Sequence, residues 1–111
     1  MNSLQVGGRE VALDKDGFLL NLADWSEPVA EALAAREALL LSDAHRDVLL
    51  LLREFYREFQ LSPATRPLVK YMTLKLGPEK GGSAQLNRLF KGTPAKLAAK
   101  LAGLPKPTNC L

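Results

Sequence analysis

Residues 42–59 read SDAHRDVLLLLREFYREF, and this stretch decides the fold class. Its apolar side chains recur at the spacing of one helix face, at Val48, Leu49, Leu52, Phe55, Tyr56 and Phe59. Ser42 can cap such a helix, and Asp43 can stabilise its positive end. We therefore predict a helix from about Asp43 to Phe59, which forms the central core helix and uses its aromatic residues for packing.

Further helices are predicted downstream of this one. Ser62 opens a helix over about residues 63–76, with Leu68, Val69, Met72 and Leu76 on its buried face. A flexible basic loop over residues 80–82 separates it from a short helix over residues 83–90. The last helix begins at residues 93–94 and ends at residues 102–103, where a glycine takes the usual C-terminal position.

Upstream of residue 42 the pattern predicts an N-terminal β-hairpin and one helix. Short β-prone pieces lie at residues 4–6, 11–13 and 18–20, separated by turns that contain glycine. Ser26 can cap a helix that has a proline in its first turn. The apolar positions of that helix extend from Val29 to about Leu40.

Length and composition indicate a single globular domain. The chain has 111 residues, 47% apolar and 24% charged, which excludes wholesale disorder. The longest apolar run, residues 48–52, is far too short to span a membrane, and the N-terminus lacks the order of a secretory signal. One cysteine cannot form an internal disulfide. We expect a soluble, cytoplasmic, mainly α domain over residues 1–103.

Charge is distributed unevenly along the chain. Residues 1–61 carry six Lys and Arg against eleven Asp and Glu, whereas residues 62–111 carry nine against one, Glu79. A basic half of this kind usually meets a polyanion or an acidic protein surface. The alternative is a solvated surface with no partner.

The chain ends in LPKPTNCL, residues 104–111. Its two prolines favour an extended, flexible arm that cannot continue the preceding helix. The arm carries the only cysteine of the chain, Cys110, as the penultimate residue. Because chain ends are rarely packed and an exposed thiol is readily oxidised, a thiol at this place indicates that the cysteine has a function.

A thiol on an arm suits a carrier better than an enzyme that cleaves bonds. The chain has one histidine, His45, to which we assign a surface or capping role. One histidine and one cysteine do not make a metal site, and neither glycine pair has the flanking pattern of a nucleotide-binding loop. We therefore predict no metal and no cofactor, and a cargo of sulfane sulfur or a thioester-linked group on Cys110.

The strongest alternative is a helix-turn-helix protein that binds nucleic acid. The predicted helices over residues 63–76 and 83–90 are joined by a short basic loop and resemble a DNA-reading pair. Arg88 and Lys91 would then face phosphates or bases. Such helix pairs are often present for packing alone, and this interpretation assigns no function to Cys110.

Several stretches resemble the DsrC/TusE family of sulfur carriers. The ending AGLPKPTNCL, residues 102–111, is similar to the C-terminal signature of that family. The resemblance continues through WSEP at residues 25–28, SPATR at residues 62–66 and PAK at residues 94–96. It therefore covers nearly the whole chain.

The resemblance implies a small orthogonal helical bundle of about five helices, an N-terminal β-hairpin, and a C-terminal arm whose Cys110 carries a persulfide. Members that serve dissimilatory sulfite reductase have a second cysteine eleven positions before the last, where this chain has Ala99. The chain therefore resembles the TusE branch. That branch takes sulfur from the TusBCD complex and hands it to the tRNA 2-thiouridylase MnmA for thiolation of the wobble uridine, so that tRNA is an indirect partner.

Cationic side chains are the candidate partner-binding residues, namely Lys106, Lys100, Lys96, Arg66 and Lys70. Cations near the arm favour the thiolate, which is the reactive form of cysteine, whereas the Leu111 carboxylate next to Cys110 acts in the opposite sense. The cations also favour docking to acidic donor surfaces. Within the family, the alternative is a DsrC-like partner of a sulfite reductase or of another sulfur-oxidation system.

Overall fold

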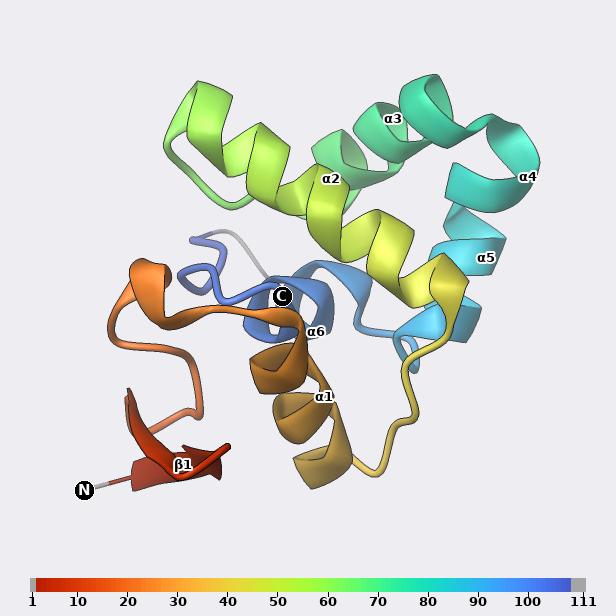
Figure 1. Ribbon diagram of the computed structural model, residues 1–111. Helices are drawn as coiled ribbons and strands as arrows, with labels where there is room; N and C mark the ends of the chain where they lie inside the picture. The colour runs from red at the N-terminus through yellow and green to blue at the C-terminus, as the bar shows by residue number, and fades with distance from the viewer. Residues whose placement is uncertain (1, 109–111) are drawn as a thin grey trace.

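The computed structural model describes residues 2–108 and begins with the predicted hairpin (Figure 1). β1 (Asn2–Val6) pairs antiparallel with β2 (Arg9–Leu13) around a turn of two glycines with positive φ. The expected third piece, residues 18–20, is reduced to a single bridge from Leu19 to the end of β2. A 3-10 turn, η1 (Leu22–Asp24), then leads to the first helix.

α1 (Glu27–Arg36) begins where the sequence predicts and ends earlier. Its cap is Ser26, whose side-chain oxygen accepts a hydrogen bond from Val29 N at 3.4 Å. The predicted extension to Leu40 is wrong, because Ala38 takes a φ of 55° and turns the chain out of the helix. Leu40 is consequently 90% exposed instead of buried.

α2 (Asp43–Phe59) has the predicted bounds and the predicted serine cap. Its apolar stripe is buried from Val48 to Phe55. Phe59 is 49% exposed, although its ring lies 4.6 Å from that of Phe55. The prediction of a packing role therefore holds for the body of the stripe and fails for its last residue.

α3 (Thr65–Leu76) begins three residues after Ser62, so that Ser62 is not its cap. Leu68 and Met72 are buried on its inner side, and Gly77 ends the helix as predicted.

The flexible loop predicted at residues 80–82 is wrong, because a helical turn, α4 (Pro78–Gly81), occupies this place. Proline suits the first position of a helix, since the N–H group that it lacks would have no partner within the helix there. Gly81 packs against α3 so closely that a Cβ would lie 2.1 Å from the carbonyl oxygen of Met72. α5 (Ser83–Leu89) follows directly.

α6 (Pro94–Leu101) is the most buried helix among residues 2–108, a place that the sequence pattern assigns to α2. Six of its eight residues are buried, and it contacts α1, α2, α3 and α5. The alanines Ala95, Ala98 and Ala99 allow this close approach because their side chains are small. In Figure 1, α6 lies at the centre of the view, between α2 above it and α1 below it. The described fold is mainly helical with an N-terminal hairpin, as predicted.

Within residues 2–108, no helix combines the length and the apolar composition that a membrane span requires.

Candidate functional site

The C-terminal segment, residues 102–108, leaves α6 at a clamp formed by Trp25 and Arg53. The indole Nε1 of Trp25 donates to the carbonyl oxygen of Leu101 at 2.9 Å, and Nη1 of Arg53 donates to that of Ala102 at 2.7 Å. The guanidinium also lies over the indole, 4.5 Å from its centre, as in cation–π pairs. Burial lowers the pKa of Arg53, and the positive charge of Arg57 lowers it further. Side chains from two distant parts of the chain thus fix the end of α6.

Gly103 fits into this clamp because it has no side chain. Its φ is 74°, and a Cβ there would lie 2.5 Å from Cδ1 of Trp25. The next residue, Leu104, is 1% exposed, and its N–H donates to the carbonyl oxygen of Ala99 at 2.9 Å. Leu104, placed by the sequence at the start of the arm, therefore packs in the core.

Ser62 holds the segment one residue further on. Its Oγ donates to the carbonyl oxygen of Pro105 at 2.6 Å, a role different from the predicted helix cap. Pro105 and Lys106 are exposed, whereas Pro107 is buried again. Cys110 lies outside the described residues, so its role, the domain boundary and the extent of the arm stay predictions.

A cleft of about 310 Å³ lies beside this segment. Its lining includes Thr65 at the start of α3, Thr93 at the start of α6, and the side chains of Lys96 and Lys106. The structure therefore brings together two of the five predicted partner-binding cations, from α6 and from the C-terminal segment.

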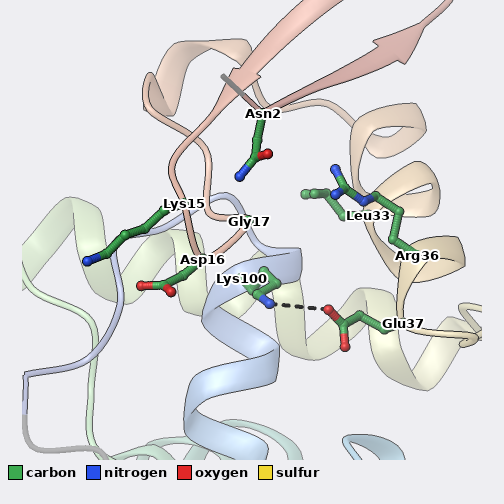
Figure 2. Close-up of a pocket in the computed structure, with 8 residues that line it drawn as sticks. All are labelled: Asn2, Lys15, Asp16, Gly17, Leu33, Arg36, Glu37 and Lys100. Atoms are coloured by element: carbon green, nitrogen blue, oxygen red, sulfur yellow. Dashed lines mark hydrogen bonds and ion pairs between the residues drawn. The ribbon is translucent and has the colours of Figure 1, made fainter.

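The other three predicted cations lie outside this cleft. Arg66 and Lys70 are exposed one turn apart on α3. Lys100 is half-buried, with its Nζ 3.2 Å from a carboxylate oxygen of Glu37 and 5.2 Å from the centre of the Phe18 ring (Figure 2). Of the five, Lys100 alone is in an ion pair among residues 2–108.

His45 has a structural role. Its Nδ1 accepts a hydrogen bond from Ser42 N at 3.1 Å, which completes a capping box at the start of α2. Its Nε2 then carries the proton and lies 2.8 Å from the carbonyl oxygen of Leu89. The predicted capping role is confirmed, but the side chain is buried and not on the surface.

The described residues 2–108 contain no group of three His, Cys, Asp or Glu side chains that could hold a metal ion. Sequence reasoning missed the anchoring roles of Trp25, Arg53 and Ser62. Trp25 and Ser62 lie in stretches that carry the family resemblance, WSEP and SPATR, whereas Arg53 lies in neither.

Comparison with known proteins supports the assignment of nearly the whole chain to one protein family. The family model described as "DsrC like protein" matches residues 5–111. The chain belongs to the DsrC family. Solved members share its fold: the NMR structure of DsrC from Allochromatium vinosum has a TM-score of 0.90 at 45% identity and covers 99% of this chain and 98% of its own. The oxidized γ-subunit of dissimilatory sulfite reductase (DsrC) from Archaeoglobus fulgidus has a TM-score of 0.85 at 36% identity, covering 99% and 100%.

Curated DsrC-family relatives include proteins named for sulfur transfer. The sulfurtransferase TusE homolog of Haemophilus influenzae is 52% identical over 108 residues, which are 97% of this chain and 99% of that protein. Sulfurtransferase TusE of Salmonella typhimurium is 51% identical over 104 residues, 94% of this chain and 95% of its own. The predicted sulfurtransferase class, a carrier in a sulfur relay, is confirmed by these relatives.

Proposed function

We propose that Cys110 accepts sulfane sulfur as a persulfide and passes it to an acceptor protein for 2-thiolation of tRNA. The observation that carries this proposal is the place of the only thiol, two residues beyond the last described residue of a segment that is clamped to the body. The sulfurtransferase relatives, which are 52% and 51% identical in sequence to this chain, support the proposal.

The transfer moves one sulfur atom between two thiolates without net oxidation. The Cys110 thiolate attacks the terminal sulfur of a donor persulfide, forming a new S–S bond while the S–S bond of the donor breaks. The donor leaves as a thiolate, and the proton on the transferred sulfur stays with it. The same exchange in the next complex returns Cys110 to its starting form.

The persulfide must be discharged on another protein, because the chain has no second cysteine. The position of the second cysteine expected by family resemblance is Ala99, which is 1% exposed in α6. An intramolecular di- or trisulfide is therefore excluded by composition.

The partners we propose are a TusBCD-type donor complex and an MnmA-type 2-thiouridylase, with tRNA held by the latter. The name TusE borne by the relatives is consistent with this relay. Lys96, Lys106, Lys100, Arg66 and Lys70 would assist docking through their charge. We place the relay in the cytoplasm, where a single thiol is kept reduced.

Mass spectrometry of the intact protein after incubation with a persulfide donor tests the proposal. We expect a mass increase equal to one sulfur atom in the wild type, its loss on addition of dithiothreitol, and its absence in Cys110→Ser. A wild-type protein that stays unmodified beside a loaded positive control would overturn the proposal.

A truncation offers a second test, and the structure decides where it must begin. Removal of residues 104–111 would take away the core residue Leu104, so the truncation should remove residues 109–111 only. We expect this variant to unfold at the wild-type temperature and to take up no sulfur. Transfer from loaded protein to a purified sulfite reductase in preference to a thiouridylase would favour the DsrC-like alternative.

A further inference from the structure

Three clefts that share lining residues lie in a row along α6. The cleft beside Lys106, of about 310 Å³, shares Thr93 and Lys96 with a second cleft of about 230 Å³. The second cleft shares Glu37 and Lys100 with a third, of about 200 Å³, which reaches the hairpin. The three clefts therefore adjoin one another from the C-terminal segment to the turn after β2, and we call this row of clefts the groove.

Positive charge prevails along this groove. Its lining contains two carboxylates, Asp16 and Glu37, against six cationic side chains, Lys15, Arg36, Lys91, Lys96, Lys100 and Lys106. Glu37 is already neutralised by Lys100 at 3.2 Å. The excess of positive charge therefore stays available to a polyanion.

The cations differ in how firmly they are held. Lys91 is fixed by hydrogen bonds from its Nζ to the carbonyl oxygens of Glu37 and Ala38. Lys96, Lys106 and Arg36 take part in no ion pair within residues 2–108. In Figure 2 the side chains of Arg36, Lys100 and Asn2 converge on the same hollow. In the middle of the groove Lys91 and Lys100 are therefore held in place. Towards its two ends lie cations without a carboxylate partner within residues 2–108, Arg36 at one end and Lys106 at the other.

The remaining walls favour phosphate over a protein partner. The polar lining residues besides the charged ones are hydroxyls and amides, Thr65, Thr93, Asn87 and Asn2, and no aromatic side chain lines any of the three clefts. Protein interfaces usually depend on aromatic or apolar anchors at their centre. Contacts to the nucleic-acid backbone use Lys, Arg, hydroxyls and amides. The lack of an aromatic platform also argues against base stacking.

We propose that this groove binds the sugar-phosphate backbone of RNA directly. The proposal rests on the proposed function, in which the sulfur is transferred to tRNA. The sequence predicts tRNA as an indirect partner, whereas here it contacts the protein directly. Two of the predicted partner-binding cations, Lys96 and Lys106, then contact the RNA, while Lys100 neutralises Glu37. Binding should be salt-dependent and indifferent to base sequence, since phosphates carry no sequence information.

The test measures fluorescence anisotropy of a labelled, unmodified tRNA transcript at several salt concentrations. The protein is the full chain with Cys110→Ser, so that thiol chemistry plays no part. Lys96→Gln/Lys106→Gln is compared with Lys75→Gln/Lys80→Gln, which has the same net charge and changes exposed lysines outside the groove. We expect the groove pair to weaken binding by about tenfold or more and to lower the slope of log affinity against log salt by about 2, roughly 1 for each lysine.

Each outcome of this test decides the proposal. No salt-dependent binding, or an equal loss in both pairs of variants, would overturn it. Displacement of the RNA by poly-glutamate at equal charge concentration would assign the groove to an acidic protein instead. Sulfur uptake by Cys110 is measured separately, so uptake without RNA binding refutes this proposal alone, and RNA binding without uptake refutes the proposed function alone.

Discussion

Nη1 of Arg53 on α2 donates a hydrogen bond to the carbonyl oxygen of Ala102, at 2.7 Å, across 49 positions of sequence. The same guanidinium donates to the carbonyl oxygen of Leu22 at 3.3 Å and lies over Trp25. One side chain therefore joins α2, the turn before α1 and the start of the C-terminal segment. These contacts anchor the start of the C-terminal segment to the body of the protein.

Arg53→Met should destabilise the fold, because two carbonyl oxygens lose a charged donor while the aliphatic part of the side chain is kept. We expect the free energy of unfolding to fall by about 1–3 kcal/mol, measured by urea denaturation. Arg57→Met is the matched control, since Arg57 is exposed on the same helix. Equal losses in the two variants would mean that the hydrogen bonds to Ala102 and Leu22 contribute nothing.

Gly103→Ala should be more harmful than Gly92→Ala, although both glycines have positive φ, 74° and 81°. A Cβ at Gly92 meets no atom within 4 Å, so that variant isolates the cost of the backbone conformation, about 1–2 kcal/mol. At Gly103 a Cβ would lie 2.5 Å from Trp25, and overpacking raises the expected loss to about 2–5 kcal/mol.

The fluorescence of Trp25 checks the cause of this difference. Because Trp25 is the only tryptophan, its emission reports the clamp alone. We expect a shifted emission spectrum in Gly103→Ala and an unchanged one in Gly92→Ala. Identical spectra and identical stability for the two variants would contradict the steric argument.

The sequence predicted those features that depend on neighbours in the chain. The bounds of α2 follow from its apolar stripe and from Ser42, and the end of α3 follows from Gly77. Ser26 and the hairpin likewise depend on residues a few positions apart. Helix periodicity, caps and turns are local, and local patterns are visible in one sequence.

The missed features depend on residues far apart in the chain. Ser62 is a residue type that often caps a helix, but its hydroxyl donates to the carbonyl oxygen of Pro105, 43 positions away. Leu104 was placed in the arm because prolines follow it, whereas its side chain fills a gap in the core. Which distant groups meet depends on packing, and no pattern within either stretch contains that information. The role of Cys110 is predicted from its position in the sequence alone, and it stays a prediction because this residue lies outside the described part of the chain.

His45→Ala should weaken the start of α2 and its attachment to α5. The imidazole bonds to Ser42 N and to the carbonyl oxygen of Leu89, and its ring meets that of Phe90 edge-on at 5.3 Å. Removing it leaves a partly buried carbonyl oxygen without this donor, and we expect a loss of about 1–3 kcal/mol in urea denaturation.

His45→Gln separates the two roles. A glutamine at this position can keep the capping box through its side-chain oxygen but is not expected to reach Leu89 at the same time. We therefore expect its stability to fall between those of the wild type and His45→Ala. Equal stability of the Gln and Ala variants would show that the capping bond is without effect.

Tyr71 should ionise at higher pH than an ordinary tyrosine. Burial raises the pKa of its phenol, and the negative charges of Glu54 and Glu58 raise it further. Since the folded protein favours the neutral phenol, this group contributes stability below the ordinary phenol pKa of about 10, and that contribution is lost as pH rises from there through the higher folded value. The tyrosinate absorbance of the wild type minus that of Tyr71→Phe isolates this group from the second tyrosine. Glu54→Gln/Glu58→Gln should lower the pKa of Tyr71 only in part, because burial, the largest single cause, is unchanged in this variant. A return to the ordinary value would instead assign the whole shift to the carboxylates.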